Sequence, residues 1–527
     1  MALSFDVGTK LPDRPLGSAT AHTSVLSGLE AHAIAVEVTC SRGPAFFQLV
    51  GLAEAAVREA RVRVASALAR LGVLLDEHAI TVNLAPADLR KRGTSLDVAI
   101  AVALLGALDR LPAGALDDVL VLGELSLEGG LRPVRGVLPQ LVGARARGIR
   151  RVIVPEANAR EAGLVRGLDV HVASSLESVV LHFTGQTLLP RAAETELPPP
   201  REPAGDADLA HLCGQGLARR ALEIAAVGGH NLLMIGPPGG GKTMLARSLA
   251  GILPPLSFAE AIETTAIHSV AGLVDPALGV VDARPFRAPH HSVSDAGLVG
   301  GGDNPRPGEV SLAHHGVLFL DELAEFRRSA LEALRQPLED GRVCISRARA
   351  AAWFPARPIL VAAVNDCPCG YRRHPRRVCR CSEREASRYL ARLSGPLLDR
   401  IDLHVAVPPV EPAALGSTGR GEPSASVRAR VLAARERARA RAAALGLGSG
   451  LNATLTNAEL ERAMPLDADA RATLERSVDR LGLSARAFTR IRRVARSVAD
   501  LEGSREVTER HVAEAVQGRI ANGSPLG

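Results

Sequence analysis

The sequence predicts an α/β fold, because strand-like apolar runs alternate with segments of helical spacing along most of its 527 residues. A second observation is that residues 195–208 are rich in proline and acid and have no periodicity, which indicates a break between domains. A third is that residues 427–520 have helical patterns almost throughout. Together these patterns predict an N-terminal α+β domain, a central domain with a parallel sheet, and a helical C-terminal domain.

The expected domain boundaries follow from changes in periodicity and in proline, glycine and acid content. A chain of this length should hold about three domains, at roughly 150 residues for each. In chain order we expect a tail at 1–20, an α+β domain at 21–186, a linker at 187–208, the parallel-sheet domain at 209–415, a flexible joint at 416–426 and a helical domain at 427–520.

The composition is that of an ordinary globular protein, with 46% hydrophobic and 23% charged residues. No window approaches the roughly 18 uninterrupted apolar residues of a membrane helix. The first residues also lack the basic start and apolar core of a secretory signal. We therefore expect a cytoplasmic protein with no membrane partner. The net charge of +6 permits binding to nucleic acid without requiring it.

A glycine-rich segment, GPPGGGKT at 236–243, follows the strand-like run 231–235 and precedes a helical pattern. This strand–loop–helix setting is typical of a phosphate-binding loop, whose backbone N–H groups wrap phosphates at the positive end of a helix. Lys242, one of three lysines in the chain, is expected to reach the β- and γ-phosphates of ATP. The expected ATP-binding residues are Gly236, Pro237, Pro238, Gly239, Gly240, Gly241, Lys242, Thr243 and Met244.

A second motif, VLFLDE, is a buried-strand pattern that ends in Asp321 and Glu322. With Thr243, Asp321 is expected to hold Mg²⁺, and Glu322 to orient and deprotonate the attacking water. The alternative is a solvated strand end. Asn365 ends the strand-like run 358–364 and is expected to touch the γ-phosphate and this water; a plain turn asparagine is its alternative. ATP and Mg²⁺ are the cofactors that these motifs predict.

The order of phosphate loop, LFLDE, AAVN and GPLLDRIDLHV (395–405) resembles that of AAA+ ATPases. Within that class, RPFRAPHHSVSDAGLVGGG (284–302) and RPGEVSLAHHGVLFLDEL (306–323) resemble the Mg-chelatase-like ComM/YifB family, and the resemblance covers nearly the whole chain. It implies that Arg400 is an arginine finger for a neighbouring subunit and that Arg486 in the helical lid senses nucleotide. A surface ion pair is the alternative for Arg400. A finger supplied in trans implies a homo-oligomeric ring, expected to be a hexamer.

The family resemblance also implies a function. We expect an ATP-driven motor that acts on single-stranded or branched DNA, by unwinding or branch migration in recombination or natural transformation. One alternative is a chelatase subunit that drives metal insertion, since such subunits share the ATPase core. A third hypothesis is an ATP-dependent protease.

The N-terminal domain resembles the protease domain of Lon-type enzymes (S5 domain 2-like) over residues 122–158 and at the segment from Lys91 to Ser95. Ser95 occupies the position of the catalytic serine, but Gln140 stands where the catalytic lysine would be. A serine hydroxyl needs a neighbouring base, and an amide cannot accept its proton. We expect a proteolytically inactive domain; the alternative is a protease with an unusual base.

Four of the seven cysteines form two C-x-C pairs, Cys367 with Cys369 and Cys379 with Cys381. Four thiolates can close a tetrahedral zinc site, whereas disulfides are rare in the cytosol. We expect structural Zn²⁺ here, with His374 as either a substitute ligand or a loop histidine.

The cysteine segment is also strongly basic. It carries arginines at positions 372, 373, 376, 377 and 380, which either grip phosphates in a ring pore or form a solvated charged loop. His290 and His291 are adjacent in the sequence, and adjacent side chains seldom converge on one ion. We expect the segment that holds them to contact DNA or a neighbouring subunit.

Overall fold

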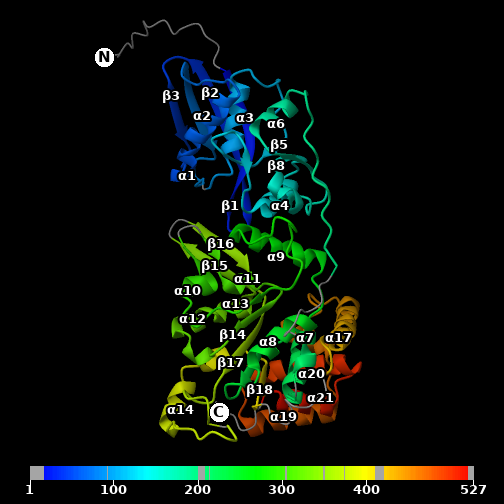
Figure 1. Ribbon diagram of the computed structural model, residues 1–527. Coiled ribbons are helices and arrows are strands. Elements are labelled where there is room, and N and C mark those ends of the chain that lie inside the picture. The colour runs from blue at the N-terminus through cyan, green and yellow to red at the C-terminus, as the bar shows by residue number, and fades with distance from the viewer. Residues whose placement is uncertain are drawn as a thin grey trace, which may run out of the picture. The chain divides into compact units, whose positions relative to one another are not determined.

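A computed structural model describes residues 17–91, 93–199, 208–212, 214–302, 305–347, 350–372, 374–409 and 421–519 (Figure 1). The chain divides into two compact units. Unit 1 comprises Met1–Leu197 and Thr265–Val281, and unit 2 comprises Pro198–Thr264 and Asp282–Gly527. Both units mix helices and sheet, which confirms the predicted α/β fold class.

Unit 1 contains a seven-stranded mixed sheet. The long strands β1 and β2 pair antiparallel along their whole length, from Gly17 opposite Cys40 to Ser27 opposite Glu30. Strands β5, β8 and β9 continue the sheet in parallel from β1. In sheet order the strands are β3 (Phe46–Val50), β4 (His78–Ala85), β2 (Glu30–Arg42), β1 (Gly17–Ser27), β5 (Val119–Val121), β8 (Arg151–Pro155) and β9 (Asp169–Ala173).

A buried helix, α3 (Asp97–Ala107), forms the centre of the unit 1 core because its side chains are apolar on nearly every side. It packs against β1 and β2. Its first residue, Asp97, is fully buried and accepts hydrogen bonds from the Arg63 guanidinium at 2.6 and 2.9 Å. The other helices of unit 1 are α1 (Ala55–Arg58), α2 (Ala60–Arg70), α4 (Val137–Ala146), α5 (Ala159–Ala162) and α6 (Leu176–Phe183).

The expected linker at 187–208 differs from the structure in its first half. The Thr195 N–H donates to the carbonyl of Gly163 at 3.0 Å, and the Ala192 N–H donates to Val170 at 2.8 Å, so this stretch is fixed to unit 1. The expected tail at 1–20 also ends earlier, because β1 begins at Gly17. Residues 200–207 of the linker and 416–420 of the expected joint lie outside the described residues.

A second segment joins unit 1 from the middle of the expected ATPase domain. Helix α9 (Phe258–Ala271) crosses from unit 2 to unit 1 after Thr264. Within unit 1, the Ser269 hydroxyl bonds the buried carboxylate of Glu161 and accepts from the Gly136 N–H at 2.9 Å. Burial raises the pKa of Glu161, and the Ser269 hydroxyl opposes that shift. Sequence periodicity cannot reveal this change of partner, because the helical pattern continues unbroken.

Unit 2 contains a five-stranded parallel sheet in the order β11-β14-β17-β10-β18. The strands are β11 (Phe286–Arg287), β14 (Val317–Leu320), β17 (Ile359–Val364), β10 (Leu232–Ile235) and β18 (Leu403–Ala406). Every residue of β14, β17 and β10 is buried, as expected for a sheet covered on both faces. A separate antiparallel hairpin is formed by β15 (Arg342–Arg347) and β16 (Ala350–Pro355).

Helices and short strands complete the core of unit 2. The bounds are α7 (Gly216–Gly228), α8 (Lys242–Ile252), α10 (Asp295–Val299), β12 (Gly300–Gly301), β13 (Arg306–Pro307), α11 (Glu309–Leu312), α12 (Arg328–Ala333), α13 (Arg335–Asp340), α14 (Glu383–Leu390) and α15 (Gly395–Leu398).

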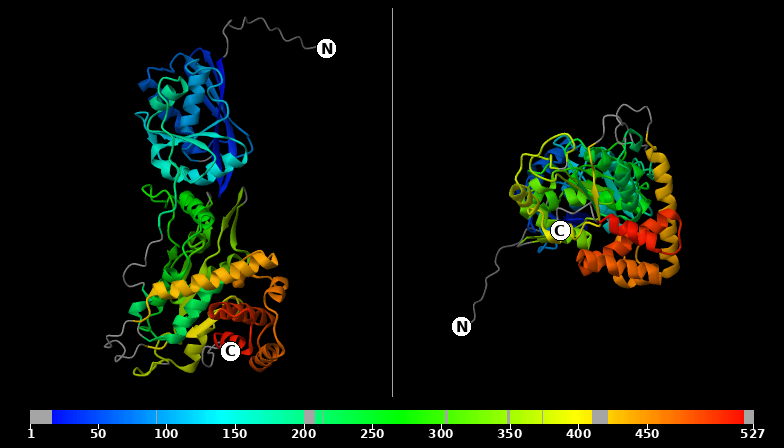
Figure 2. Two further views of the ribbon diagram at one scale, coloured as in Figure 1. Left: turned by 90° about the vertical axis from the view of Figure 1, so that its right-hand side faces the viewer. Right: turned by 90° about the horizontal axis from the view of Figure 1, so that it is seen from below.

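The C-terminal part of unit 2 is helical, and its longest helix, α17, is seen along its whole length in Figure 2. Buried charges tie these helices together. Asp500 on α20 is about 1% exposed and accepts from Arg441 on α17 at 2.5 Å and from Arg496 at 2.9 Å. The helices are α17 (Ser424–Leu445), α18 (Asn457–Ala463), α19 (Ala468–Leu481), α20 (Ala485–Glu502) and α21 (Glu509–Gln517).

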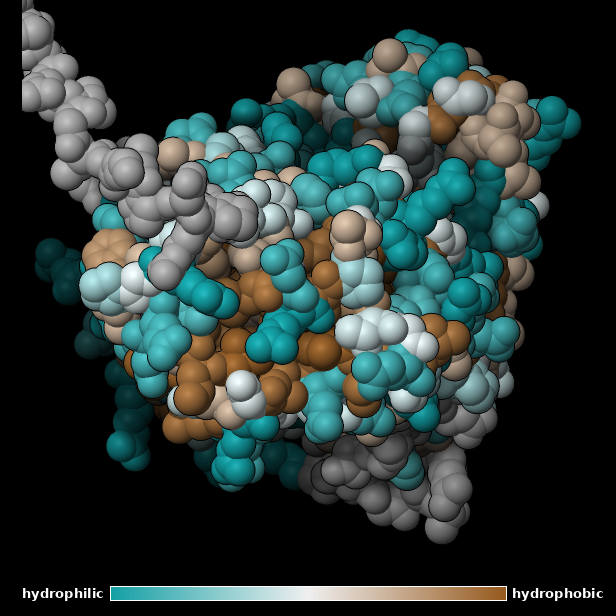
Figure 3. Space-filling model, turned by 90° about the horizontal axis from the view of Figure 1, so that it is seen from above, coloured by the Kyte–Doolittle hydropathy of each residue, from teal (hydrophilic) through white to brown (hydrophobic). Residues whose placement is uncertain are grey.

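Figure 3 shows apolar residues gathered on one face of the molecule. Among the exposed apolar side chains of unit 1 are Phe46 on the edge strand β3, which is 51% exposed, and Val62 and Leu74. Across the described ranges, no helix combines the length and the apolar character needed to cross a bilayer.

Candidate nucleotide-binding site

The order of the unit 2 sheet brings three sequence motifs to one edge. The loop 236–243 follows β10, Asn365 follows β17, and Asp321 and Glu322 follow β14. Because these strands are parallel neighbours, their carboxyl ends meet at the same edge, where ligands bind in open α/β sheets. Strand β17 lies between the other two, so Asn365 stands between the phosphate loop and the acidic pair.

The phosphate loop is shaped by its glycines and by Lys242. Gly239 and Gly241 have φ angles of 81° and 82°, a region that favours glycine. The Lys242 ammonium donates to the carbonyls of Gly236 at 2.6 Å and Pro237 at 2.9 Å. Burial lowers the pKa of Lys242, while the nearby carboxylates, led by Asp321, oppose this shift. The expected binding residue Met244 is half-buried and packs against the core of unit 2.

Asn365 is in contact with the phosphate loop. Its Oδ1 accepts a hydrogen bond from Lys242 Nζ at 3.0 Å. An amide at this position has both a donor and an acceptor, so it can contact a phosphate oxygen and a water together.

The magnesium residues expected from the sequence also meet. Thr243 Oγ1 donates to Asp321 Oδ2 at 3.1 Å, and Asp321 Oδ1 accepts from the Glu322 N–H at 2.9 Å. A hydroxyl and a carboxylate are oxygen ligands of the kind that Mg²⁺ prefers. These residues fit the ion, and Mg²⁺ bound there would neutralise charge that develops on the phosphates.

Glu322 has a partner that the sequence did not indicate. Its Oε2 lies 3.2 Å from Nδ1 of His291, and its backbone has a φ of 51°, which is uncommon for a residue other than glycine. Strand β11 pairs with β14 so that Arg287 is opposite Leu318; carrying this register forward by four residues places His291 opposite Glu322. A two-residue strand leaves too little pattern in the sequence to reveal this pairing.

The two arginines expected from the family resemblance lie in different settings. Arg400 is 6% exposed; its Nη2 lies 2.5 Å from Glu339 Oε1, and its Nη1 donates to the Pro396 carbonyl at 2.6 Å. Arg486 is exposed in the first turn of α20, which begins after the capping hydroxyl of Ser484. Their roles toward nucleotide stay predictions.

The four cysteines of 367–381 converge. Cys367 Sγ lies 3.4 Å from Cys369 Sγ and 3.6 Å from Cys379 Sγ, and all four sulfurs, including that of Cys381, lie within 4.8 Å of one another. A zinc tetrahedron with Zn–S bonds of about 2.3 Å has edges of about 3.8 Å, so the spacing fits Zn²⁺. Backbone N–H groups of residues 371 and 380 lower the pKa of Cys369 to about 6. His374 is not in this cluster, since its Nδ1 accepts backbone bonds from residues 376 and 377.

The loop that holds the four cysteines, residues 367–381 and here called the cysteine loop, packs against the nucleotide site. Gly370 has a φ of 80°, and a Cβ added there would lie 2.7 Å from Cδ of Pro238 and 3.8 Å from Cγ of Asn365. The turn between the cysteine pairs therefore packs directly on the phosphate loop.

A second group, Glu263, His314 and His315, resembles a metal site but is satisfied by hydrogen bonds. His314 Nδ1 accepts from the Arg357 N–H at 3.0 Å, so Nε2 carries the proton and points to Glu263 Oε2 at 3.1 Å. A protonated nitrogen cannot ligate a metal. We interpret this group as a structural link between α9 and the start of β14.

Ser95 and Gln140 do not form a catalytic pair among the described hydrogen bonds. Gln140 is 2% exposed; its Oε1 accepts from Ser24 Oγ at 2.9 Å and its Nε2 donates to the Gly136 carbonyl at 3.1 Å. The nearest lysine in sequence, Lys91, is fully buried and donates to the carbonyl of Pro86. Neither arrangement supplies a base to the serine.

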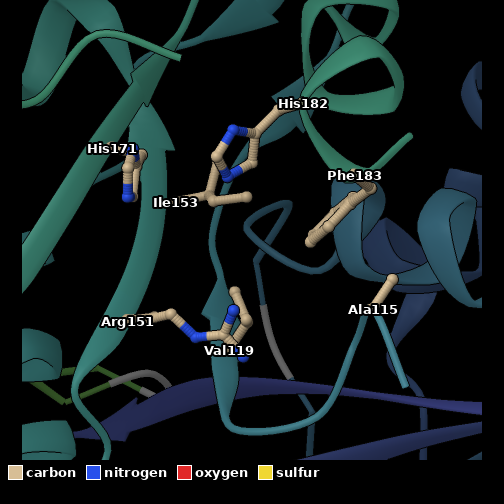
Figure 4. Close-up of a pocket in the computed structure, with 7 residues that line it drawn as sticks. All are labelled: Ala115, Val119, Arg151, Ile153, His171, His182 and Phe183. Atoms are coloured by element: carbon tan, nitrogen blue, oxygen red, sulfur yellow. The ribbon is translucent and has the colours of Figure 1, made fainter. Parts of the chain in front are cut away.

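Unit 1 also holds a cavity of about 200 Å³ lined by Arg151, His171, His182 and Phe183 (Figure 4). Both histidines are hydrogen-bonded to the backbone of Leu189. His171 Nδ1 lies 3.3 Å from the carbonyl oxygen of Leu189, and the backbone N–H of Leu189 donates to His182 Nδ1 at 3.2 Å. These rings thus anchor the segment that follows α6, which accounts for them without a ligand.

The phosphate loop follows β10, and its Thr243 pairs with Asp321 at the end of β14. Asn365 ends the strand between them, β17. These features define a P-loop nucleotide-binding protein of the AAA+ type. Comparison with known proteins narrows the class. Family models match residues 36–158 (subunit ChlI of Mg-chelatase), 208–415 (magnesium chelatase, subunit ChlI) and 421–519 (its C-terminal region).

Several relatives match the chain nearly end to end, among them the following two. Competence protein ComM of Haemophilus influenzae is 46% identical over 494 residues, 93% of this chain and 95% of that one. YifB of Escherichia coli is 44% identical over 499 residues, 94% and 96% of the two chains. Lon protease 2 of Bacillus subtilis is 30% identical over 148 residues, 26% of each chain. The chain belongs to the ComM/YifB family of Mg-chelatase-like AAA+ proteins, a class that implies ATPase activity with ATP and Mg²⁺.

Proposed function

We propose that the protein is a cytoplasmic, hexameric, ATP-hydrolysing motor that acts on DNA by unwinding or branch migration, as in recombination or natural transformation. The observation that carries the ATPase part is the meeting of Lys242, Asn365 and Asp321 at one sheet edge. The similarity to a competence protein supports the DNA part.

The DNA part has further support from an exposed aromatic side chain. Trp353, the only tryptophan in the chain, is 46% exposed on the β15–β16 hairpin, and the guanidinium of Arg342 lies 4.3 Å from its ring centroid. An exposed aromatic beside a cation is the arrangement that stacks on nucleic-acid bases and attracts the backbone. Exposed arginines of the cysteine loop, such as Arg376, add positive charge to a loop whose Gly370 packs on Pro238.

The ring part of the proposal depends on Arg400. In the single chain its guanidinium is paired with Glu339, whose side chain is 45% exposed. We propose that the γ-phosphate of ATP bound to a neighbouring subunit competes with the Glu339 carboxylate for Arg400. The guanidinium would then move into the site shared by the two subunits. Arg486, exposed at the start of α20, would contact nucleotide bound to its own chain.

Mixing two inactive variants tests the shared site. Lys242→Ala removes the phosphate contact and Arg400→Ala removes the finger, so each should be inactive alone. Mixed rings should regain ATPase activity, because an Arg400→Ala subunit has an intact phosphate loop that a Lys242→Ala neighbour can complete. Mixtures that stay inactive, although native mass measurements show that they assemble, would exclude a finger in trans.

We propose that Zn²⁺ is held by Cys367, Cys369, Cys379 and Cys381, with a structural role. Bound there, the metal would cross-link the two C-x-C pairs. This would fix the turn at Gly370 that packs on Pro238.

Phosphate release measured with and without DNA tests the whole proposal. Single-stranded or forked DNA should raise the ATPase rate, and Glu322→Gln should bind ATP without turning it over. In a branch-migration assay on three-strand or Holliday substrates, product should form only with ATP. An ATPase that DNA neither binds nor stimulates contradicts the motor.

The second candidate is a chelatase subunit that drives metal insertion. The matches to magnesium chelatase subunit ChlI over three parts of the chain favour it. It predicts an ATPase whose rate does not depend on DNA, so the DNA assay above separates the two functions.

A further inference from the structure

The cysteine loop runs from the end of β17 to α14 (Figure 1), and its four cysteines are free thiols that lie close together beside the nucleotide site. We propose that Cys369 and Cys379 form a reversible oxidation site, and that a disulfide made between them by a peroxide weakens nucleotide binding at the phosphate loop. This proposal rests on the proposed function only in that the phosphate loop binds ATP.

The positions of the thiols favour this pair. The sulfurs of Cys369 and Cys379 lie 3.6 Å apart, and an S–S bond of about 2.05 Å requires them to approach by about 1.5 Å. Both side chains are half-buried. Cys367 is nearer to Cys369, at 3.4 Å, but it is fully buried. An oxidant that arrives from solvent therefore reaches Cys369 and Cys379 before Cys367.

The oxidation removes two electrons from the two sulfurs. The Cys369 thiolate attacks one oxygen of hydrogen peroxide, the O–O bond breaks, and a sulfenic acid and a hydroxide ion form. The Cys379 thiolate then attacks the Cys369 sulfur, so that the S–S bond forms, the S–O bond breaks and a second hydroxide leaves. Two protons convert the two hydroxides to water. A thiol reductant reverses the modification by exchange.

The disulfide would change the turn that packs on the phosphate loop. Gly370 follows Cys369 directly, and its N–H donates to the Cys367 carbonyl at 2.9 Å. A Cβ built on Gly370 would lie 2.7 Å from Cδ of Pro238, so the backbone has no room to move toward the phosphate loop. Drawing Cys369 toward Cys379 moves this turn either onto Pro238 or away from it, and both movements alter the fit.

The start of the cysteine loop provides a second connection to the nucleotide site. One residue separates Cys367 from Asn365, and Asn365 Oδ1 accepts from Lys242 Nζ at 3.0 Å. The loop thus adjoins the phosphate loop at Pro238 and the strand end at Asn365. We therefore expect oxidation to change the affinity for ATP. The two oxidised sulfurs would also no longer be available as zinc ligands, so any metal held there would be released.

A variant that keeps only the thiols of the cysteine loop tests the site. C40A/C213A/C344A removes every other cysteine of the chain. After treatment with hydrogen peroxide, mass spectrometry of the digested protein should show peptides joined through Cys369 and Cys379. The Kd for a fluorescent ATP analogue, measured without DNA, should rise about fivefold or more, the factor that about 1 kcal/mol of misfit gives. Dithiothreitol should return Kd to the value of the reduced protein.

The matched control removes one partner of the bond. The Kd of C379S after peroxide should stay within twofold of the Kd of the same variant before treatment. Because each variant is compared with its own reduced form, the comparison holds even where the substitution alone changes affinity or stability.

The outcomes decide the proposal. It is overturned if no disulfide joins Cys369 to Cys379, if the joined protein keeps its Kd, if dithiothreitol does not restore binding, or if C379S responds to peroxide as fully as the wild type does. Zinc is measured in the reduced samples. Its absence there would contradict the zinc site, whereas the disulfide and the Kd would still decide this proposal. A reduced chain that binds no ATP contradicts the nucleotide-binding function, and this proposal falls with it.

Discussion

Replacing Gly370 by alanine tests whether the cysteine loop supports the nucleotide site. A residue other than glycine at a φ of 80° costs about 1–2 kcal/mol, and the new Cβ would also lie 2.7 Å from Cδ of Pro238. Relieving such an overpacked contact costs about 1–3 kcal/mol. Because the contacted ring belongs to the phosphate loop, we expect this second cost to appear as weaker nucleotide binding, by about 5- to 140-fold in Kd at about 1.4 kcal/mol for each factor of ten.

The control is Gly482→Ala. Gly482 has a φ of 59° and nothing within 4 Å of an added Cβ, so it bears the backbone cost without the contact. Titration with a fluorescent ATP analogue gives Kd for both variants, and elemental analysis gives their zinc content. We expect Gly482→Ala to bind nucleotide as wild type does. A Kd for Gly370→Ala within twofold of wild type, with thermal stability lowered in both variants, would refute a mechanical link between the cysteine loop and the phosphate loop.

Three further predictions concern DNA, zinc and pH. Trp353→Ala should weaken single-stranded DNA binding by about 1–3 kcal/mol, whereas Trp353→Phe should retain most of the affinity; equal affinities would exclude stacking. Cys379→Ser should lower zinc content and melting temperature, while Cys344→Ser, outside the cluster, should retain the metal; equal zinc in both would remove the site. Burial lowers the pKa of His314 to about 4, below its ordinary value of 6.5, so the unfolded chain takes up this proton more readily and stability falls as pH drops from about 6.5 to 4. Melting curves for His314→Asn should therefore show a smaller fall over this range than wild type, and an unchanged fall would contradict that origin.

The fold class and the family could be predicted from the sequence because their signals are local. The loop at 236–243 needs only a strand before it and a helix after it, and the buried strands before Asp321 and Asn365 are continuous apolar runs. Once the strands are parallel neighbours, the meeting of their ends follows.

The rest depends on contacts between distant parts of the chain. The His291–Glu322 pair can be predicted only when the register of the two-residue strand β11 is known. The contact of Gly370 with Pro238 joins loops more than a hundred residues apart in sequence. Arg400 illustrates a further limit. The motif LLDRID predicts its role but not its burial against Glu339, which lies on α13.

The passage of α9 from unit 2 to unit 1 has a consequence for how the protein can be divided. Residues 265–281 belong to the fold of unit 1, yet they are encoded inside the ATPase sequence. A fragment ending at residue 199 would leave the buried carboxylate of Glu161 without Ser269. An ATPase fragment starting at residue 208 would contain residues 265–281 but lack the rest of unit 1, against which they pack. Gene fusions or exchanges with relatives must therefore move this insert together with the N-terminal unit, and the two units can be expected to have been inherited as one.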